Sequence, residues 1–142
     1  MEKDSKIYDY AIIGAGAAGL HLSLAMLADK WFAQKKILII DKDDKTSNDK
    51  TWSFWEKGAG KWDSIIEKSW SKGKFNTKKE SIDLDLTPYL YKTLPSINFY
   101  EFGRKNITKS DNVEWIKAEV AAVNNTGDKI EITGEELSLI HI

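Results

Sequence analysis

Cysteine is absent from the 142 residues, and histidine, proline and methionine occur only twice each. The lack of cysteine excludes disulfides, thiolate metal sites and a cysteine nucleophile. His21 and His141 alone argue against a histidine metal cluster. The 21 basic and 22 acidic residues nearly cancel, so the composition gives no general electrostatic reason to bind nucleic acid. The length suits one domain with a sizeable core.

A long apolar run is also missing. The longest one is interrupted by His21, Ser23 and Asp29, and none approaches the roughly 18 residues of a transmembrane helix. The start, Met1–Lys6, is a short polar lead rather than a signal peptide. We therefore expect a cytoplasmic protein, with any membrane association being peripheral and made by the full-length protein.

A glycine-rich turn lies between two predicted strands. An apolar run through Ile13 leads into GAGAAG at residues 14–19, followed by a helical pattern through Leu27 and a second strand, Ile37–Ile40, with Asp41 at its end. G-x-G-x-x-G between a strand and a helix is the dinucleotide-binding pattern. The sequence therefore predicts an α/β fold: a Rossmann-like βαβ domain of the kind that binds FAD or NAD(P).

Each part of this turn has a physical role. Gly14 permits a sharp turn, Gly16 lets a pyrophosphate approach the backbone, and Gly19 allows close packing of helix on strand. The unpaired amides of the first helical turn favour a phosphate, and Asp41 is placed to accept hydrogen bonds from a ribose. The candidate cofactor-binding residues here are Gly14, Ala15, Gly16, Ala17, Ala18, Gly19, Asp41 and Lys42. The alternative is a βαβ unit whose glycines only pack the turn.

The polar stretch Lys42–Lys50 is predicted to be a loop beside the adenosine half of a cofactor. In it, Lys42 could pair with a phosphate or with Asp41, or be solvated. FAD is favoured over NAD because, in many flavoproteins with two nucleotide folds, the fingerprint near the N-terminus holds FAD. This preference is an analogy between families.

The next segment is rich in aromatic residues, namely Trp52, Phe54, Trp55, Trp62 and Trp70. Aromatic and basic residues together can stack on nucleic-acid bases. Here Glu56, Asp63 and Glu67 offset the lysines, so no basic field accompanies the rings. The segment is therefore predicted to line a pocket or fill a core.

The remaining pattern predicts further strands and one helix. Ser81–Leu86 alternates strictly and predicts a half-buried strand, on which Asp83 and Asp85 face solvent rather than forming an acid–base pair. The other predicted elements are a strand at Tyr89–Leu94, a helix at Ile97–Thr108, strands at Asn112–Val120 and Lys129–Thr133, and a turn at Asn124–Asp128. The ending, residues 137–142, resembles a translated sequencing adapter, and we treat it as a candidate non-native tail.

Two stretches carry a resemblance to a known family. The start YDYAIIGAGAAGLHLSLAML, followed by ILIIDKDDKTSNDKTWSFWE, is similar to the N-terminal part of flavin-dependent lycopene β-cyclases. The block Asn48–Trp55 is the more specific half, because many flavoproteins share G-x-G-x-x-G. Tyr89–Thr93 and Asn98–Phe102 are also similar to the subsequent stretches of that family.

The resemblance implies FAD as cofactor, needed in its reduced form, with NAD(P)H as a candidate reductant. It implies an apolar carotenoid substrate whose ends close to β-ionone rings without net redox change. It assigns Gly14, Gly16 and Gly19 to the pyrophosphate, Asp41 to the ribose and, more weakly, Val120 to the adenine. The acidic motif thought to serve proton transfer lies further along in the family, so no catalytic residue is assigned here.

The resemblance also sets the expected domain organisation. Residues 1–142 would form an incomplete N-terminal FAD-binding domain, in which residues 52–110 include the start of a substrate-domain or pocket-wall segment. Two alternatives stay open. One is an FAD-dependent monooxygenase or isoprenoid reductase of the same fold, and the other is a non-catalytic nucleotide-binding module or an inactive fragment.

Overall fold

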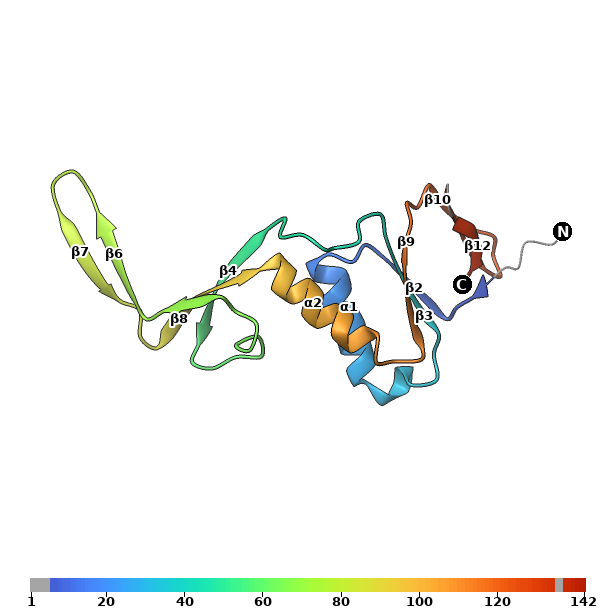
Figure 1. Ribbon diagram of the computed structural model, residues 1–142, viewed down its shortest axis with the longest axis horizontal. Helices are drawn as coiled ribbons and strands as arrows, with labels where there is room; N and C mark the ends of the chain where they lie inside the picture. Colours follow the sequence, from blue (N-terminus) through green and yellow to red (C-terminus); the bar gives the residue numbers. More distant parts are fainter. Residues whose placement is uncertain (1–5, 135–136) are drawn as a thin grey trace. The chain divides into compact units, whose positions relative to one another are not determined.

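The computed structural model describes residues 6–134 and 137–142. The chain divides into two compact units (Figure 1). The first unit combines Met1–Lys45 with Gly103–Ile142, and the second is the intervening segment Thr46–Phe102. The predicted pocket-wall segment thus lies largely in a unit of its own.

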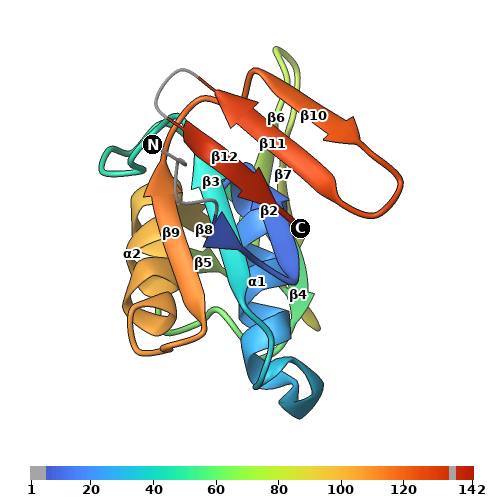
Figure 2. The same ribbon diagram turned by 90° about the vertical axis from the view of Figure 1, so that its right-hand side faces the viewer.

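The first unit is built on a parallel sheet. Its strands are β2 (Tyr10–Ile13), β3 (Ile37–Asp41) and β9 (Val113–Lys117), in the order β2-β3-β9. Figure 2 shows β3 between its two neighbours. Residues 37–40 are fully buried, which explains their continuous apolar run, because a central parallel strand is covered on both faces. Helix α1 (Ala17–Ala28) connects β2 to β3 as predicted, and it is followed by a short 3-10 turn, η1 (Lys30–Phe32), that was not predicted.

A second sheet completes this unit. It consists of β1 (Lys6–Ile7), β10 (Ala122–Asn125), β11 (Ile130–Gly134) and β12 (Leu137–His141), in the order β1-β12-β11-β10. Tyr8, Leu38, Ile40, Ala118 and Ile132 form a buried apolar cluster. A turn near residues 124–128 is present, but it joins β11 to β10, which was not predicted. The strand predicted at Asn112–Val120 is shorter (β9, Val113–Lys117) and pairs with β3 instead. Residues 137–141 add a strand to β11, and their suggested non-native origin remains a prediction.

Helix α2 (Ser96–Ile107) confirms the helix predicted at Ile97–Thr108. Gly103 weakens the intrinsic helix propensity of this segment, but a side chain at this position would crowd the neighbouring helix. A Cβ there would lie 3.3 Å from the methyl groups of Leu20, a buried residue of α1. The missing side chain therefore lets the two helices approach closely at this point.

The second unit contains two antiparallel sheets. One has the order β4-β8-β5, formed by β4 (Thr51–Lys57), β8 (Tyr89–Pro95) and β5 (Lys68–Trp70). The other is the hairpin of β6 (Lys72–Asn76) and β7 (Ser81–Asp85). The predicted strands at 81–86 and 89–94 are confirmed, whereas β4 and β5 were not predicted because their aromatic residues were attributed to a pocket wall or core.

The aromatic segment contributes to both faces of the β4-β8-β5 sheet. Trp52 packs edge-on against Phe99 and Tyr100, with ring centroids 5.7 and 6.0 Å apart, and Trp62 packs against Phe99 at 5.1 Å. Phe99 and Tyr100 are buried. These rings fill a core, in agreement with one of the two predicted roles for this segment.

A buried lysine stabilises the same sheet. The side chain of Lys92 is only 1% exposed. Its ammonium donates hydrogen bonds to Asp63 at 2.5 Å, to Glu56 at 2.8 Å and to the Gly58 carbonyl at 2.9 Å. All three N–H groups of the lysine are thereby paired, and the loop after β4 is tied to β8.

We expect this anchor to make stability depend on pH. The hydrogen bond from Lys92, followed by that from the Gly60 amide, holds the pKa of Asp63 below its usual 3.8. A lowered pKa in the folded state gives a stabilising contribution that is present above the usual pKa and is lost as pH falls through the lowered value. Asp63→Asn should therefore lower the melting temperature at neutral pH and have progressively less effect in acid.

Thermal unfolding at several pH values measures this difference. Asp83→Asn is the matched control, because Asp83 is 85% exposed in its ion pair with Lys74 and such surface pairs contribute little. A difference between wild type and Asp63→Asn that did not shrink in acid would contradict the role assigned to the Asp63 charge.

Candidate functional site

The carboxyl ends of the three parallel strands meet at one edge of the first unit. The Gly14 amide donates to the Ile40 carbonyl at 2.7 Å, which extends the β2–β3 pairing into the glycine turn. The Ala118 amide donates to the Asp41 carbonyl at 2.9 Å, which extends the β3–β9 pairing beyond the end of β9. The glycine turn, the acidic residue after β3 and the segment after β9 are therefore neighbours. Ligands of open α/β sheets bind at this edge.

A cavity of about 340 Å³ opens there. It is lined by Ile13, Gly14, Ile40, Asp41, Lys42, Lys45, Ala118, Glu119 and Val120. Four predicted cofactor-binding residues, Gly14, Asp41, Lys42 and Val120, are thus brought together from three separate segments. The other five, residues 15–19, continue from Gly14 into the first turn of α1 without lining this cavity.

The three motif glycines differ in what their surroundings require. Gly14 has a φ of +102°, which side-chain-bearing residues rarely adopt. A Cβ on Gly19 would lie 1.8 Å from the Gly14 carbonyl oxygen, so only glycine permits this contact between helix and turn. A Cβ on Gly16 would have no atom within 4 Å, so the backbone there faces open space. These are the sharp turn, the close packing and the open approach that the motif predicts.

The start of α1 is suited to an anion. Gly16 is its N-cap and supplies no side-chain hydrogen bond, and the first turn carries no acidic residue. The first amides of a helix have no partner within the helix and lie at the positive end of its dipole. The open space at Gly16 and the amides after it therefore have the features expected of a phosphate-binding site.

Asp41 is held in place by its own neighbourhood. One carboxylate oxygen accepts the Ala15 amide at 2.6 Å, and the other accepts the Asp43 amide at 2.8 Å and pairs with Lys45 at 3.4 Å. Asp41 therefore fastens the glycine turn to the end of β3, a role that the sequence motif did not indicate. A carboxylate offers about four acceptor positions, so the oxygen facing Ala15 can also accept a ribose hydroxyl.

Lys42 agrees with the solvated alternative, because its side chain is 73% exposed. Lys42 pairs with Glu119 at 3.7 Å on the surface and not with Asp41. The partner of Asp41 is Lys45, whose side chain is 13% exposed and whose backbone has a φ of +54°. Lys45 and Glu119 were missed by sequence reasoning, and the only available signal was a lysine four positions after the acidic residue.

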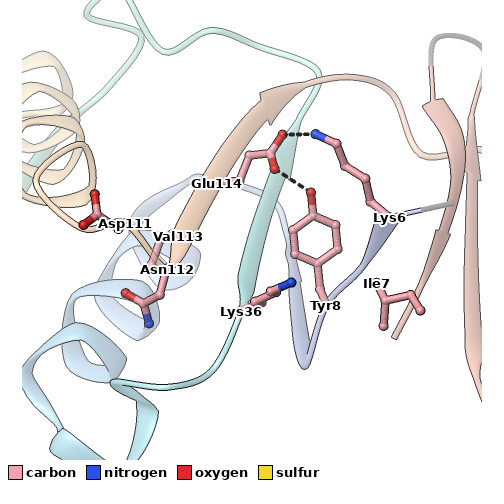
Figure 3. Close-up of a pocket in the computed structure, with 8 residues that line it drawn as sticks. All are labelled: Lys6, Ile7, Tyr8, Lys36, Asp111, Asn112, Val113 and Glu114. Atoms are coloured by element: carbon pink, nitrogen blue, oxygen red, sulfur yellow. Dashed lines mark hydrogen bonds and ion pairs between the residues drawn. The ribbon is translucent and has the colours of Figure 1, made fainter. Parts of the chain in front are cut away.

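A second cavity, of about 330 Å³, lies at the opposite ends of the strands (Figure 3). Tyr8 donates to Glu114 at 2.6 Å and Lys6 donates to the other oxygen of Glu114 at 2.8 Å. Burial, followed by the hydrogen bond to Glu114, raises the pKa of Tyr8 well above its usual range. The hydrogen bonds from Lys6 and Tyr8 lower the pKa of Glu114.

The two cavities are similar in volume, so strand direction decides between them. Tyr8, Lys36 and Asn112 precede β2, β3 and β9, which places the second cavity at the amino ends of the strands. The first lies at the carboxyl ends, beside the glycine turn. We therefore take the first as the nucleotide-site candidate and regard the Tyr8–Glu114–Lys6 cluster as a structural link between β9 and the segment before β2.

Comparison with protein families gives the family of the chain. The model of the lycopene cyclase protein family matches residues 9–138. The chain belongs to the lycopene cyclase family. The match spans both units, including the glycine turn and the aromatic segment. No curated protein sequence matches this lycopene cyclase family chain significantly.

Solved structures share its fold. The chain is similar to p-nitrophenol 4-monooxygenase PnpA from Pseudomonas putida, with 15% identity and a TM-score of 0.72 over 96% of this chain and 39% of that one. It is similar to PqsL from Pseudomonas aeruginosa in complex with 2-aminobenzoylacetate, with 12% identity and a TM-score of 0.71 over 96% of this chain and 41% of that one. It is also similar to the halogenase PltM in complex with phloroglucinol and FAD, with 14% identity and a TM-score of 0.63 over 94% of this chain and 32% of that one.

These likenesses establish a Rossmann-like α/β fold. The chain spans only about a third to two fifths of the length of those structures. Within residues 6–134 and 137–142, no helix is long and apolar enough to cross a membrane. The same described residues contain no group of histidine, cysteine and acidic side chains able to hold a metal ion.

Proposed function

We propose that this chain is the FAD-binding part of a lycopene cyclase, an enzyme that closes the ends of lycopene to β-ionone rings. The observation that carries the proposal is the family match over residues 9–138, which includes a glycine turn with the geometry of a nucleotide site. The monooxygenase and halogenase likenesses support the fold alone, so they do not favour a second function.

The residues of the first unit fit the FAD dinucleotide. The open backbone at Gly16 and the first amides of α1 would hold the pyrophosphate. Asp41 would accept a ribose hydroxyl, and Lys45 would hold the Asp41 carboxylate in place. Val120, at the end of the segment after β9, would contact the adenine.

Reduced FAD would supply negative charge that stabilises the carbocation formed when a terminal double bond of lycopene is protonated, with NAD(P)H as the proposed reductant. The residues of this chain would contribute by holding the dinucleotide in a fixed position. No acid is assigned here, because Asp83 and Asp85 lie on an exposed strand of the second unit and do not line the cavity at the nucleotide edge.

Replacing Asp41 by alanine is expected to weaken FAD binding by about 1–3 kcal/mol, because a charged hydrogen-bond acceptor is lost. Fluorescence titration of FAD measures the affinity. Asp44→Ala is the matched control, since Asp44 belongs to the same loop but its carboxylate pairs with Lys117 on the surface. Equal affinities in the two variants would contradict the ribose assignment.

The cyclase part of the proposal needs a separate test. Residues 9–138 would replace the matching segment of an active lycopene β-cyclase, and the chimera would be expressed in lycopene-accumulating cells. Cyclic carotenoids in the extract are the expected result, and the same chimera carrying Gly16→Asp should produce none. A chimera that binds FAD but leaves lycopene unchanged would count against the cyclase function while retaining the flavoprotein assignment.

A further inference from the structure

The β6–β7 hairpin has one apolar face that no element of the described chain covers. The sequence pattern predicted that the β7 strand would be half-buried, and this prediction is wrong, because all five of its residues are exposed. The alternation itself is real. Phe75 pairs with Ile82 and Gly73 with Leu84 on one side of the ribbon, and the three apolar side chains are 56%, 46% and 42% exposed, respectively.

The opposite face of the ribbon is polar. Lys72 pairs with Asp85, Lys74 with Asp83 and Asn76 with Ser81. Lys74 and Asp83 form an ion pair at 3.4 Å, and the Ser81 hydroxyl donates to Asn76 at 2.6 Å. The aspartates of β7 thus lie on the side facing away from the apolar residues, and the hairpin is an amphipathic ribbon.

The apolar face continues onto the neighbouring sheet of the same unit. Cross-strand pairing places Trp55, Tyr91 and Trp70 in a row across β4, β8 and β5, with Trp55 58% exposed. A cavity of about 320 Å³ joins this row to the root of the hairpin. It is lined by Trp55, Trp70, Lys72, Gly73, Lys74, Leu84, Leu86 and Tyr91. Contiguous exposed apolar surface of this kind marks an interaction site.

The charged residues around this surface indicate which kind of partner it binds. Residues 68–85 contain five lysines and three acidic residues, and two of the acidic residues, Asp83 and Asp85, lie across the ribbon from Lys74 and Lys72 on the polar face. Lys78 and Lys79 lie in the hairpin turn, and all five lysines are exposed. Apolar and aromatic side chains next to clustered lysines are the features of a surface that binds the interface of an anionic membrane. Tryptophan and tyrosine favour that interface, and lysine stems extend from it toward the headgroups.

We propose that the apolar face of the β6–β7 hairpin, together with the Trp55–Tyr91–Trp70 row, docks the protein onto a membrane surface that contains anionic lipid. Phe75, Ile82 and Leu84 enter the interface, and Lys68, Lys78 and Lys79 contact the headgroups. The side of the ribbon that carries the Lys74–Asp83 ion pair remains in water. This site lies in the second unit and does not depend on the nucleotide site.

Co-sedimentation of the full chain with lipid vesicles tests the proposal. Wild type should bind vesicles of equal parts phosphatidylcholine and phosphatidylglycerol, and should bind pure phosphatidylcholine vesicles about tenfold less. The double variant Phe75→Ser with Ile82→Ser should lose about tenfold of the binding. Asn76→Ala with Ser81→Ala is the matched control, because it changes the adjacent rung on the polar face and should bind as wild type does.

The absence of cysteine permits a second measurement that does not rely on lost binding. Phe75→Cys and Asn76→Cys each provide a single attachment point for an environment-sensitive fluorophore. On anionic vesicles, the probe at position 75 should shift to shorter wavelength and be shielded from an aqueous quencher, while the probe at position 76 should remain accessible. Equal responses at the two positions, vesicle binding unaffected by Phe75→Ser with Ile82→Ser, or a change only in oligomeric state on sedimentation would overturn the proposal.

Discussion

A Gly19→Ala variant is expected to lose about 3 kcal/mol or more of its free energy of unfolding. The added Cβ would lie 1.8 Å from the carbonyl oxygen of Gly14 and 3.3 Å from a methyl group of Ile12. The first obstacle is backbone, so it cannot be relieved by rotating a side chain. Overpacking of a fixed core commonly costs about 1–3 kcal/mol, and here the helix must also move away from the turn. For a domain whose total stability is about 5–15 kcal/mol, such a loss is large.

Denaturant unfolding without any cofactor measures this effect. Gly16→Ala is the matched control within the same motif, because its Cβ would meet no atom within 4 Å and its φ of −76° suits alanine. The control should unfold like wild type. Equal stability of Gly19→Ala and Gly16→Ala would show that the packing assigned to the third glycine is wrong.

Much of the first unit could be predicted because its sequence signals are local. The order of apolar strand, glycine turn, helix and buried strand specifies a βαβ unit, and residues 37–40, predicted as a strand, form the buried centre of the sheet. The location of Val120 beside Asp41 depends on β9 pairing with β3, so the pattern could not show it. For Val120 the family resemblance supplied the assignment.

The second unit was harder to predict because its chemistry depends on pairing between distant strands. The alternation of Ser81–Leu86 correctly indicated a strand, but periodicity shows only that one face is apolar and not that protein covers it. Likewise, the partners of Lys92 come from two positions about thirty residues before it, Glu56 and Asp63. No short-range pattern relates these residues, so the buried cluster appears only once the strands are paired.

Gly16→Asp is expected to abolish FAD binding while leaving the fold intact. The space in front of Gly16 is open in the protein alone, because a Cβ there would have no atom within 4 Å. When the dinucleotide is bound, the same space would be taken by the pyrophosphate. The new carboxylate would then collide with the phosphates and repel their charge at a place where the start of α1, free of acidic residues, otherwise attracts an anion.

This variant separates two interpretations of the glycine motif that sequence alone left open. If the glycines only pack the turn, Gly16→Asp should fold at least as stably as wild type and leave the response to FAD unchanged, because a Cβ at this position meets no atom within 4 Å. If they receive a pyrophosphate, FAD titration should show no saturable binding, while the unfolding free energy should be no lower than that of Gly16→Ala, because an aspartate at the N-cap suits the start of α1. Gly16→Ala, which adds volume without charge, should weaken FAD binding less than Gly16→Asp does. Undiminished FAD affinity in the aspartate variant would exclude the turn as the phosphate site.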